Sequence, residues 1–199
     1  SILFKNNIQK KYFKKKIYQK NKLKSNRFLK EIFSKIDTNK NVFYLLSKKF
    51  NLNFKPSDLK RFIKFKTVIV IGMGGSILGS NAIFTFLKSK IKKKFLFINN
   101  LDQVKIQNIN KKNIKNALFI IISKSGNTTE TLLNVNLLKN YNTNSKNTII
   151  ITENSNNILN NYSIKSKIKN FGHKKYVGGR YSVLSEVGMI PAHLMDLDI

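Results

Sequence analysis

Hydrophobic residues gather in four short runs between residues 68 and 152, and polar or glycine-rich residues follow each run. The runs are Val68–Ile71, Phe95–Ile98, Ala117–Ile122 and Thr148–Thr152. They are rich in β-branched and aromatic residues, which favours buried strands of a parallel sheet. The segments between them, such as residues 77–90 and 128–139, are long enough for one helix each. This alternation predicts a doubly wound α/β fold, a three-layer sandwich whose central parallel sheet is flanked by helices.

The first third of the chain has a different texture. Lysines alternate with apolar residues such as Leu29, Ile32 and Phe33 at spacings typical of amphipathic helices, and no chemical motif appears. We therefore expect a helical segment over residues 1–62 before an α/β domain over residues 63–199. The chain starts without Met and ends directly on an apolar helical pattern, so we expect both ends to be cut.

Two loops of small residues follow the first and third apolar runs. The first reads Gly72-Met-Gly-Gly-Ser-Ile-Leu-Gly79 and the second reads Ser123-Lys-Ser-Gly-Asn-Thr-Thr-Glu130. In parallel sheets, ligands bind at the carboxyl ends of the strands, where such loops gather. Free N–H groups and the positive end of a helix dipole favour an anion there. The hydroxyls and one lysine of the second loop would complete a phosphate site.

The first loop fits neither common nucleotide motif. The dinucleotide fingerprint requires glycine or alanine where Ile77 stands, and the P-loop requires lysine where Ser80 stands. What the loop offers is backbone that a ligand can approach closely at Gly74 and Gly75, beside the hydroxyl of Ser76. The alternative is that the glycines only form a tight turn between strand and helix.

The second loop has a structural alternative too. Thr128 or Thr129 would then be a helix N-cap, with Glu130 in the first turn complementing the dipole.

The charge is strongly positive but has little bearing on partners. The formal net charge is +29, from 38 basic and 9 acidic residues, and only Arg27, Arg61 and Arg180 are arginines. The lysines are scattered among abundant asparagine and isoleucine, as an AT-rich genome would produce, and arginine is the preferred base-reading residue. We expect no nucleic-acid partner, and a basic nucleic-acid-binding protein is the alternative.

Composition excludes several other classes. Cysteine is absent, so no disulfide framework and no thiolate metal site can form. No stretch approaches the roughly 20 apolar residues that span a bilayer. We expect a protein of the cytoplasm, with no membrane partner.

The two loops, in this order, resemble the sugar isomerase (SIS) domain, which binds phosphosugars on a parallel α/β sandwich. A third segment is similar to the signature of the glucose-6-phosphate isomerase family: Val177-Gly-Gly-Arg-Tyr-Ser-Val-Leu-Ser-Glu-Val-Gly-Met-Ile-Pro191. The resemblance covers residues 68–192. It implies interconversion of glucose 6-phosphate and fructose 6-phosphate by proton transfer through an enediolate, a homodimer for the full-length protein, and no metal or cofactor.

The resemblance also implies roles for seven residues. The positions that match those holding the sugar phosphate are Ser123, Lys124, Ser125 and Thr128. Gly75 and Ser76 match positions lining the substrate near its reacting end. Arg180 matches the arginine that offsets charge on the enediolate oxygens. A structural ion pair of Arg180 with Glu186 or an aspartate is the alternative.

In the family, the glutamate, histidine and lysine that move protons lie beyond the third segment. Glu186, His173 and His193 do not match them, so we expect this chain to be a partial copy with little or no activity. Two other interpretations stay open. One is a non-catalytic SIS-domain regulator that binds a phosphosugar, and the other is a different phosphosugar isomerase, of the arabinose-phosphate or sedoheptulose-phosphate type.

Overall fold

The structure is a computed structural model that describes residues 14–38, 41–101, 116–138 and 143–199. The chain divides into two compact units, Ser1–Phe50 and Asn51–Ile199. The first unit contains helix α2 (Lys15–Lys35), which has no buried residue, and a short 3-10 helix, η1 (Val42–Leu46). A helix before the α/β domain is thus confirmed, while residues 1–13 and 39–40 of the expected segment lie outside the described residues. The boundary expected at residues 62 and 63 stays a prediction.

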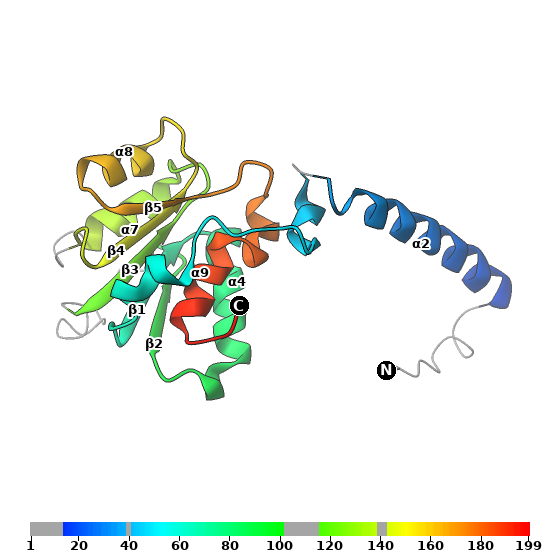
Figure 1. The fold of residues 1–199 in the computed structure, drawn as a ribbon, viewed down its shortest axis with the longest axis horizontal. Helices are drawn as coiled ribbons and strands as arrows, with labels where there is room; N and C mark the ends of the chain where they lie inside the picture. The colour runs from blue at the N-terminus through cyan, green and yellow to red at the C-terminus, as the bar shows by residue number, and fades with distance from the viewer. Residues whose placement is uncertain (1–13, 39–40, 102–115, 139–142) are drawn as a thin grey trace. The chain divides into compact units, whose positions relative to one another are not determined.

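The second unit is built on one sheet of five parallel strands (Figure 1). In spatial order they are β2 (Lys94–Ile98), β1 (Thr67–Gly72), β3 (Ala117–Ile122), β4 (Thr148–Thr152) and β5 (Lys169–Gly172). The first four are the strands that the apolar runs predict. β5 was not predicted, because Phe171 is its only buried residue and an edge strand needs little apolar sequence.

Helices cover both faces of this sheet, which confirms the three-layer sandwich. One face packs against α4 (Gly75–Phe86) and α9 (Glu186–Leu194), and the other against α7 (Thr129–Leu138) and α8 (Ile158–Lys165). Two short elements, α3 (Pro56–Leu59) and η2 (Lys60–Phe62), add Leu59 and Phe62 to the core on the α4 side.

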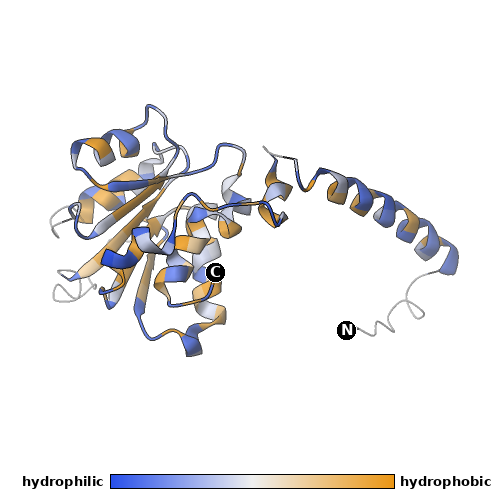
Figure 2. Cartoon of the chain, viewed as in Figure 1, coloured by the Kyte–Doolittle hydropathy of each residue, from blue (hydrophilic) through white to orange (hydrophobic). Residues whose placement is uncertain are grey.

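Alternate strand residues point to opposite faces, as the pleat requires. In β1, Val68 and Val70 face the core that contains Ile77 of α4, whereas Ile69 and Ile71 face the core that contains Leu159 of α8. These four β1 residues are at most 1% exposed, and Figure 2 shows the sheet as a hydrophobic layer between the helices.

Two of the helices differ slightly from the expected ranges. α4 begins two residues before residue 77, because Gly74 takes a positive φ of 53° and serves as its N-cap. It ends at Phe86, and a 3-10 turn, η3 (Lys88–Lys90), completes the expected range. α7 occupies residues 129–138 of the range 128–139, and Lys139 lies outside the described residues.

The strand order places the two small-residue loops side by side. The chain winds from β1 outward to β2 and then returns to β3, on the other side of β1. Gly72, the last residue of β1, pairs in register with Ile122, the last residue of β3. Loops 72–75 and 123–128 therefore leave the sheet next to each other at the point where the strand order reverses, which is where open α/β sheets bind ligands.

Candidate phosphosugar site

Three hydroxyls meet in the loop that follows β3. The hydroxyl oxygens of Ser123 and Thr128 lie 2.9 Å apart, and those of Ser125 and Thr128 lie 3.4 Å apart. Ser123 is buried, whereas Ser125 is exposed to solvent. A helix N-cap oxygen accepts from an N–H two or three residues along, but Thr128 Oγ1 bonds to the serine hydroxyls instead. The loop thus holds three hydroxyls together before the N-terminus of α7, with Ser125 at the surface.

The start of α8 supports this loop from behind. Gly126 has φ +68°, and a side chain there would collide with the Asn157 side chain and lie 2.8 Å from Thr152 Oγ1, so glycine is required. Asn157 Oδ1 also caps α8 by accepting from Asn160 N at 2.8 Å. Asn127 Oδ1 accepts from the backbone N–H of Ile158 at 3.0 Å. These contacts fix the backbone that carries the three hydroxyls.

Lys124, the predicted cation of this loop, reaches toward a third segment. Its Nζ donates to the carbonyl oxygen of Lys175 at 2.8 Å and lies 3.7 Å from Glu153 Oε1. The side chain is about one-third exposed. The ammonium is therefore held between Lys175, two residues before the third motif, and Glu153, just after β4, and its role in binding phosphate stays a prediction.

The loop after β1 packs on the backbone of that third motif. A Cβ on Gly75 would collide with the carbonyl carbon and oxygen of Gly179 and lie 2.5 Å from the backbone nitrogen of Arg180. Ser182 Oγ donates to the carbonyl oxygens of Gly75 at 3.3 Å and Gly179 at 2.7 Å. Gly75 thus makes room for the protein's own backbone, which was not predicted. Ser76, the next residue, is 9% exposed.

Arg180 lies in the 3-10 helix η5 (Gly179–Leu184) and is exposed. Among residues 14–38, 41–101, 116–138 and 143–199, it makes no ion pair. Glu186 instead bonds Lys174, at 2.6 Å, so the alternative of an Arg180–Glu186 pair is wrong. Arg180 thus has its backbone beside Gly75 and an exposed guanidinium that can bind an anion.

The two predicted loops and the chain around the start of the third motif therefore converge. Loops 72–75 and 123–128 are neighbours through β1 and β3, and the segment of residues 173–184 touches both, at Gly75 through Gly179 and at Lys124 through Lys175. Hydroxyl donors at one side and a guanidinium at the other suit a ligand with a phosphate at one end and polarised oxygens at the other.

Sequence reasoning missed one feature of this edge, a set of buried polar groups. His173 directly follows β5 and is 4% exposed, with Nδ1 3.1 Å from the carbonyl oxygen of Lys174. Burial lowers the pKa of His173 from its ordinary value of 6.5. Glu186 is fully buried at the start of α9. The burial of His173 could not be predicted, because β5 has so little hydrophobic pattern. The burial of Glu186 depends on partners elsewhere in the sequence, Asn53 and Lys174. His193, on α9, is partly exposed.

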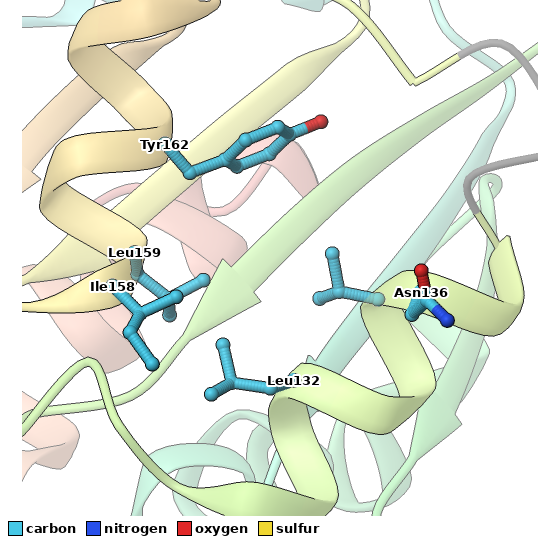
Figure 3. A pocket seen from close by; sticks show the side chains of 6 residues that line it. Leu132, Asn136, Ile158, Leu159 and Tyr162 are labelled. Carbon is cyan, nitrogen blue, oxygen red and sulfur yellow. The ribbon is translucent and has the colours of Figure 1, made fainter.

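One apolar cavity lies away from these loops. About 220 Å³ of space opens between α7 and α8, lined by Leu132, Val135, Asn136, Ile158, Leu159 and Tyr162 (Figure 3). None of these residues carries a charge, and none of the seven predicted site residues is among them. This apolar groove does not suit a phosphate dianion.

Within the described part of the chain, no three His, Cys, Asp or Glu residues are placed to hold a metal ion. No helix there is long and apolar enough to cross a membrane.

Comparison with known proteins places these features in a family. The family described as phosphoglucose isomerase matches residues 48–196. A glucose-6-phosphate isomerase from Methanocaldococcus jannaschii is 39% identical, over 68% of this chain and 34% of that protein. One from Borreliella afzelii is 36% identical, over 69% of this chain and 28% of that protein. The chain thus spans about a third of the length of these curated relatives.

A solved structure supports the same relationship. The crystal structure of a glucose-6-phosphate isomerase from Chlamydia trachomatis superposes with a TM-score of 0.56 and 25% identity, covering 69% of this chain and 29% of that one.

Proposed function

This chain belongs to the phosphoglucose isomerase family, and we propose that its three converging segments bind a hexose 6-phosphate. The supporting observation is the hydroxyl cluster of Ser123, Ser125 and Thr128, which lies beside loop 72–75 where the strand order reverses. The phosphate binds to these hydroxyls at the N-terminal end of α7, with Lys124 as the neighbouring cation. Residues 63–199 form the phosphosugar-binding domain.

Arg180 serves the reacting end of the sugar. Interconversion of glucose 6-phosphate and fructose 6-phosphate removes a proton from C2 or C1 and delivers it to the other carbon. Between removal and delivery, negative charge builds on the oxygens of the enediolate. A guanidinium held on a fixed backbone offsets that charge as it develops. Gly75 and Ser76 line this end, since Gly75 lies against the backbone of Arg180. Phosphate binding at the far end of the sugar supplies energy that orients C1 and C2.

We expect this chain to bind the sugar phosphate without turning it over rapidly. A general base needs a carboxylate or imidazole that can reach the substrate. Glu186 is fully buried and bonded to Lys174, and Glu153 pairs with Lys124. A phosphosugar-binding role without catalysis is the second candidate that this observation favours. The isomerase reaction, a homodimer and a cytoplasmic location are what family membership suggests for the whole enzyme.

Calorimetric titration tests this proposal. We expect glucose 6-phosphate to bind, inorganic phosphate to bind more weakly at the same site and compete with it, and unphosphorylated glucose to give no heat. Equal binding of glucose and glucose 6-phosphate, or no binding of either, would contradict the proposal. Retention of duplex DNA that survives moderate salt would favour the nucleic-acid alternative, because non-specific phosphate contacts weaken steeply with salt.

A coupled assay for fructose 6-phosphate tests the expectation that this chain turns the sugar phosphate over slowly or not at all. Full turnover by this chain would show that one of its own groups acts as the base.

A further inference from the structure

A buried ion pair closes the loop that carries Arg180. Lys174 Nζ and Glu186 Oε1 lie 2.6 Å apart, and their side chains are 10% and 0% exposed. Lys174 precedes the Gly-Gly-Arg motif and Glu186 follows η5, so the pair joins the two ends of the segment that contains this motif. None of the seven predicted site residues takes part in this pair. Its position at the base of the loop requires an explanation.

Asn53 joins the pair from a distant part of the sequence. Its backbone N–H donates to Glu186 Oε1 at 2.6 Å, and its Oδ1 accepts from Lys174 Nζ at 2.7 Å. Its side-chain amide donates to the carbonyl oxygen of Gly172, the last residue of β5, at 3.1 Å. The pair is thereby fastened to the edge of the sheet as well as to itself.

The loop is held at two further points. Next to Lys174, the carbonyl oxygen of Lys175 accepts a hydrogen bond from Lys124 of loop 123–128. At the tip, Gly179 rests on Gly75. Between these contacts the Arg180 side chain is exposed, so the direction of its guanidinium depends on where the loop backbone is held.

Stability alone does not account for the pair. A buried ion pair loses the hydration of both charges, and apolar residues of similar volume often replace such a pair without loss of stability. Glu186 also keeps Oε2 buried without a hydrogen-bond partner among the described residues, which is a further cost. Unlike apolar packing, the ion pair is directional. Because it is short and shared with Asn53, it permits one arrangement of the two ends of the loop.

We propose that Lys174 and Glu186, joined by Asn53, are positioning residues that fix the Arg180 loop over the sheet edge. They do not touch the substrate. They act by holding the guanidinium where the oxygens on C1 and C2 of a bound hexose phosphate lie. The inference rests on the proposed function for the identity of that ligand, whereas the restraint on the loop stands by itself.

The test compares K174M/E186Q with wild type. The E186Q change keeps an acceptor for the Asn53 N–H, and the K174M change keeps the volume, so the variant removes the ion pair and leaves the packing. The probe is 5-phospho-D-arabinonate, whose carboxylate mimics the enediolate charge. We expect its affinity to fall about tenfold, as for a lost charge-assisted hydrogen bond, while the affinity for inorganic phosphate is unchanged. E31Q/K35M, which removes an exposed pair of 2.7 Å, is the matched control and should match wild type.

Coupling to Arg180 separates positioning from a merely structural role. In R180A the same loss is expected, and adding K174M/E186Q to R180A should lower the affinity no further. Additive losses, or equal losses for phosphate and the arabinonate, would overturn the proposal. The single variant K174R keeps the positive charge opposite Glu186. An arabinonate affinity in K174R close to that of wild type would support the proposal.

Hydrogen exchange decides the restraint without any ligand. In K174M/E186Q, the amides of residues 177–184 should exchange faster while those of β3 keep their protection. Unchanged exchange would overturn the inference. If the wild-type chain binds no arabinonate, the proposed function is contradicted. The hydrogen exchange of residues 177–184 would still test the restraint on the loop. If K174M/E186Q does not fold, N53A removes one acceptor of Lys174, and unchanged exchange of the same amides in N53A overturns the inference equally.

Discussion

Gly75→Ala should separate the two loops that the proposed site requires together. The new Cβ would collide with the backbone of Gly179 and lie 2.5 Å from the backbone nitrogen of Arg180, whereas ordinary contacts begin at 3.4 Å. Backbone lies on both sides of this contact, so no side chain can rotate away. The gap between α4 and the Arg180 loop must therefore widen by about 1 Å, and such overpacking costs about 1–3 kcal/mol. For a chain of this size, that free energy lowers Tm by roughly 2–12 °C.

Gly179→Ala is the matched control on the opposite side of the same contact. A Cβ on Gly179 meets nothing within 4 Å, so Tm should stay within about 1 °C of wild type. Binding of 5-phospho-D-arabinonate should follow the same order, with a loss of about tenfold for G75A, because a displacement of Arg180 by about 1 Å removes a charge-assisted bond. Calorimetry and a thermal melt measure both quantities. Equal effects of the two substitutions would refute the close contact as the feature that brings Gly75 and Arg180 together.

The remaining predictions concern single side chains. Ser125→Ala removes an exposed hydroxyl of the cluster and should weaken the binding of inorganic phosphate about threefold to tenfold with Tm unchanged. Ser34→Ala, which changes an exposed serine on α2, should alter neither quantity. Equal phosphate affinities for wild type and S125A would argue against the phosphate role. Arg180→Lys should weaken the binding of 5-phospho-D-arabinonate but not that of phosphate, because an ammonium lacks the planar fork of a guanidinium. Calorimetry with both ligands measures this, and equal losses for the two would contradict it. Burial lowers the pKa of His173 below 6.5, so the unfolded chain binds the extra proton more readily and the free energy of unfolding falls as pH drops below 6.5 toward the folded pKa. His173→Gln should flatten this decline in Tm between about pH 7.5 and pH 5.5, and an unchanged slope would show that other groups cause it.

The arrangement of the sheet was largely readable from the sequence. Four apolar runs became four strands, because a parallel sheet covered on both faces needs continuous hydrophobic residues. β5 escaped notice, since an edge strand with Phe171 as its only buried residue leaves almost no pattern.

The candidate site was readable only in part. The motifs predicted which loops form the site, and the register of Gly72 with Ile122 brings two of these loops together. The role of Gly75 in making room for Gly179, and the pairing of Glu186 with Lys174 12 positions away, depend on contacts that form only in the folded chain. Nothing local in the sequence encodes such partners, because they follow from how α9 and η5 pack on α4.

Mapping glucose 6-phosphate onto the backbone amides by NMR tests the central claim most directly. If the three segments form one phosphosugar site, the amide signals of Ser76, Ser125, Thr128 and Arg180 should shift together along a single binding curve. Inorganic phosphate should shift those of Ser125 and Thr128 and leave that of Arg180 nearly unchanged, since we propose that the arginine binds the other end of the sugar. Saturating sugar phosphate that shifts none of these four signals, or shifts only signals of α2, would contradict the account.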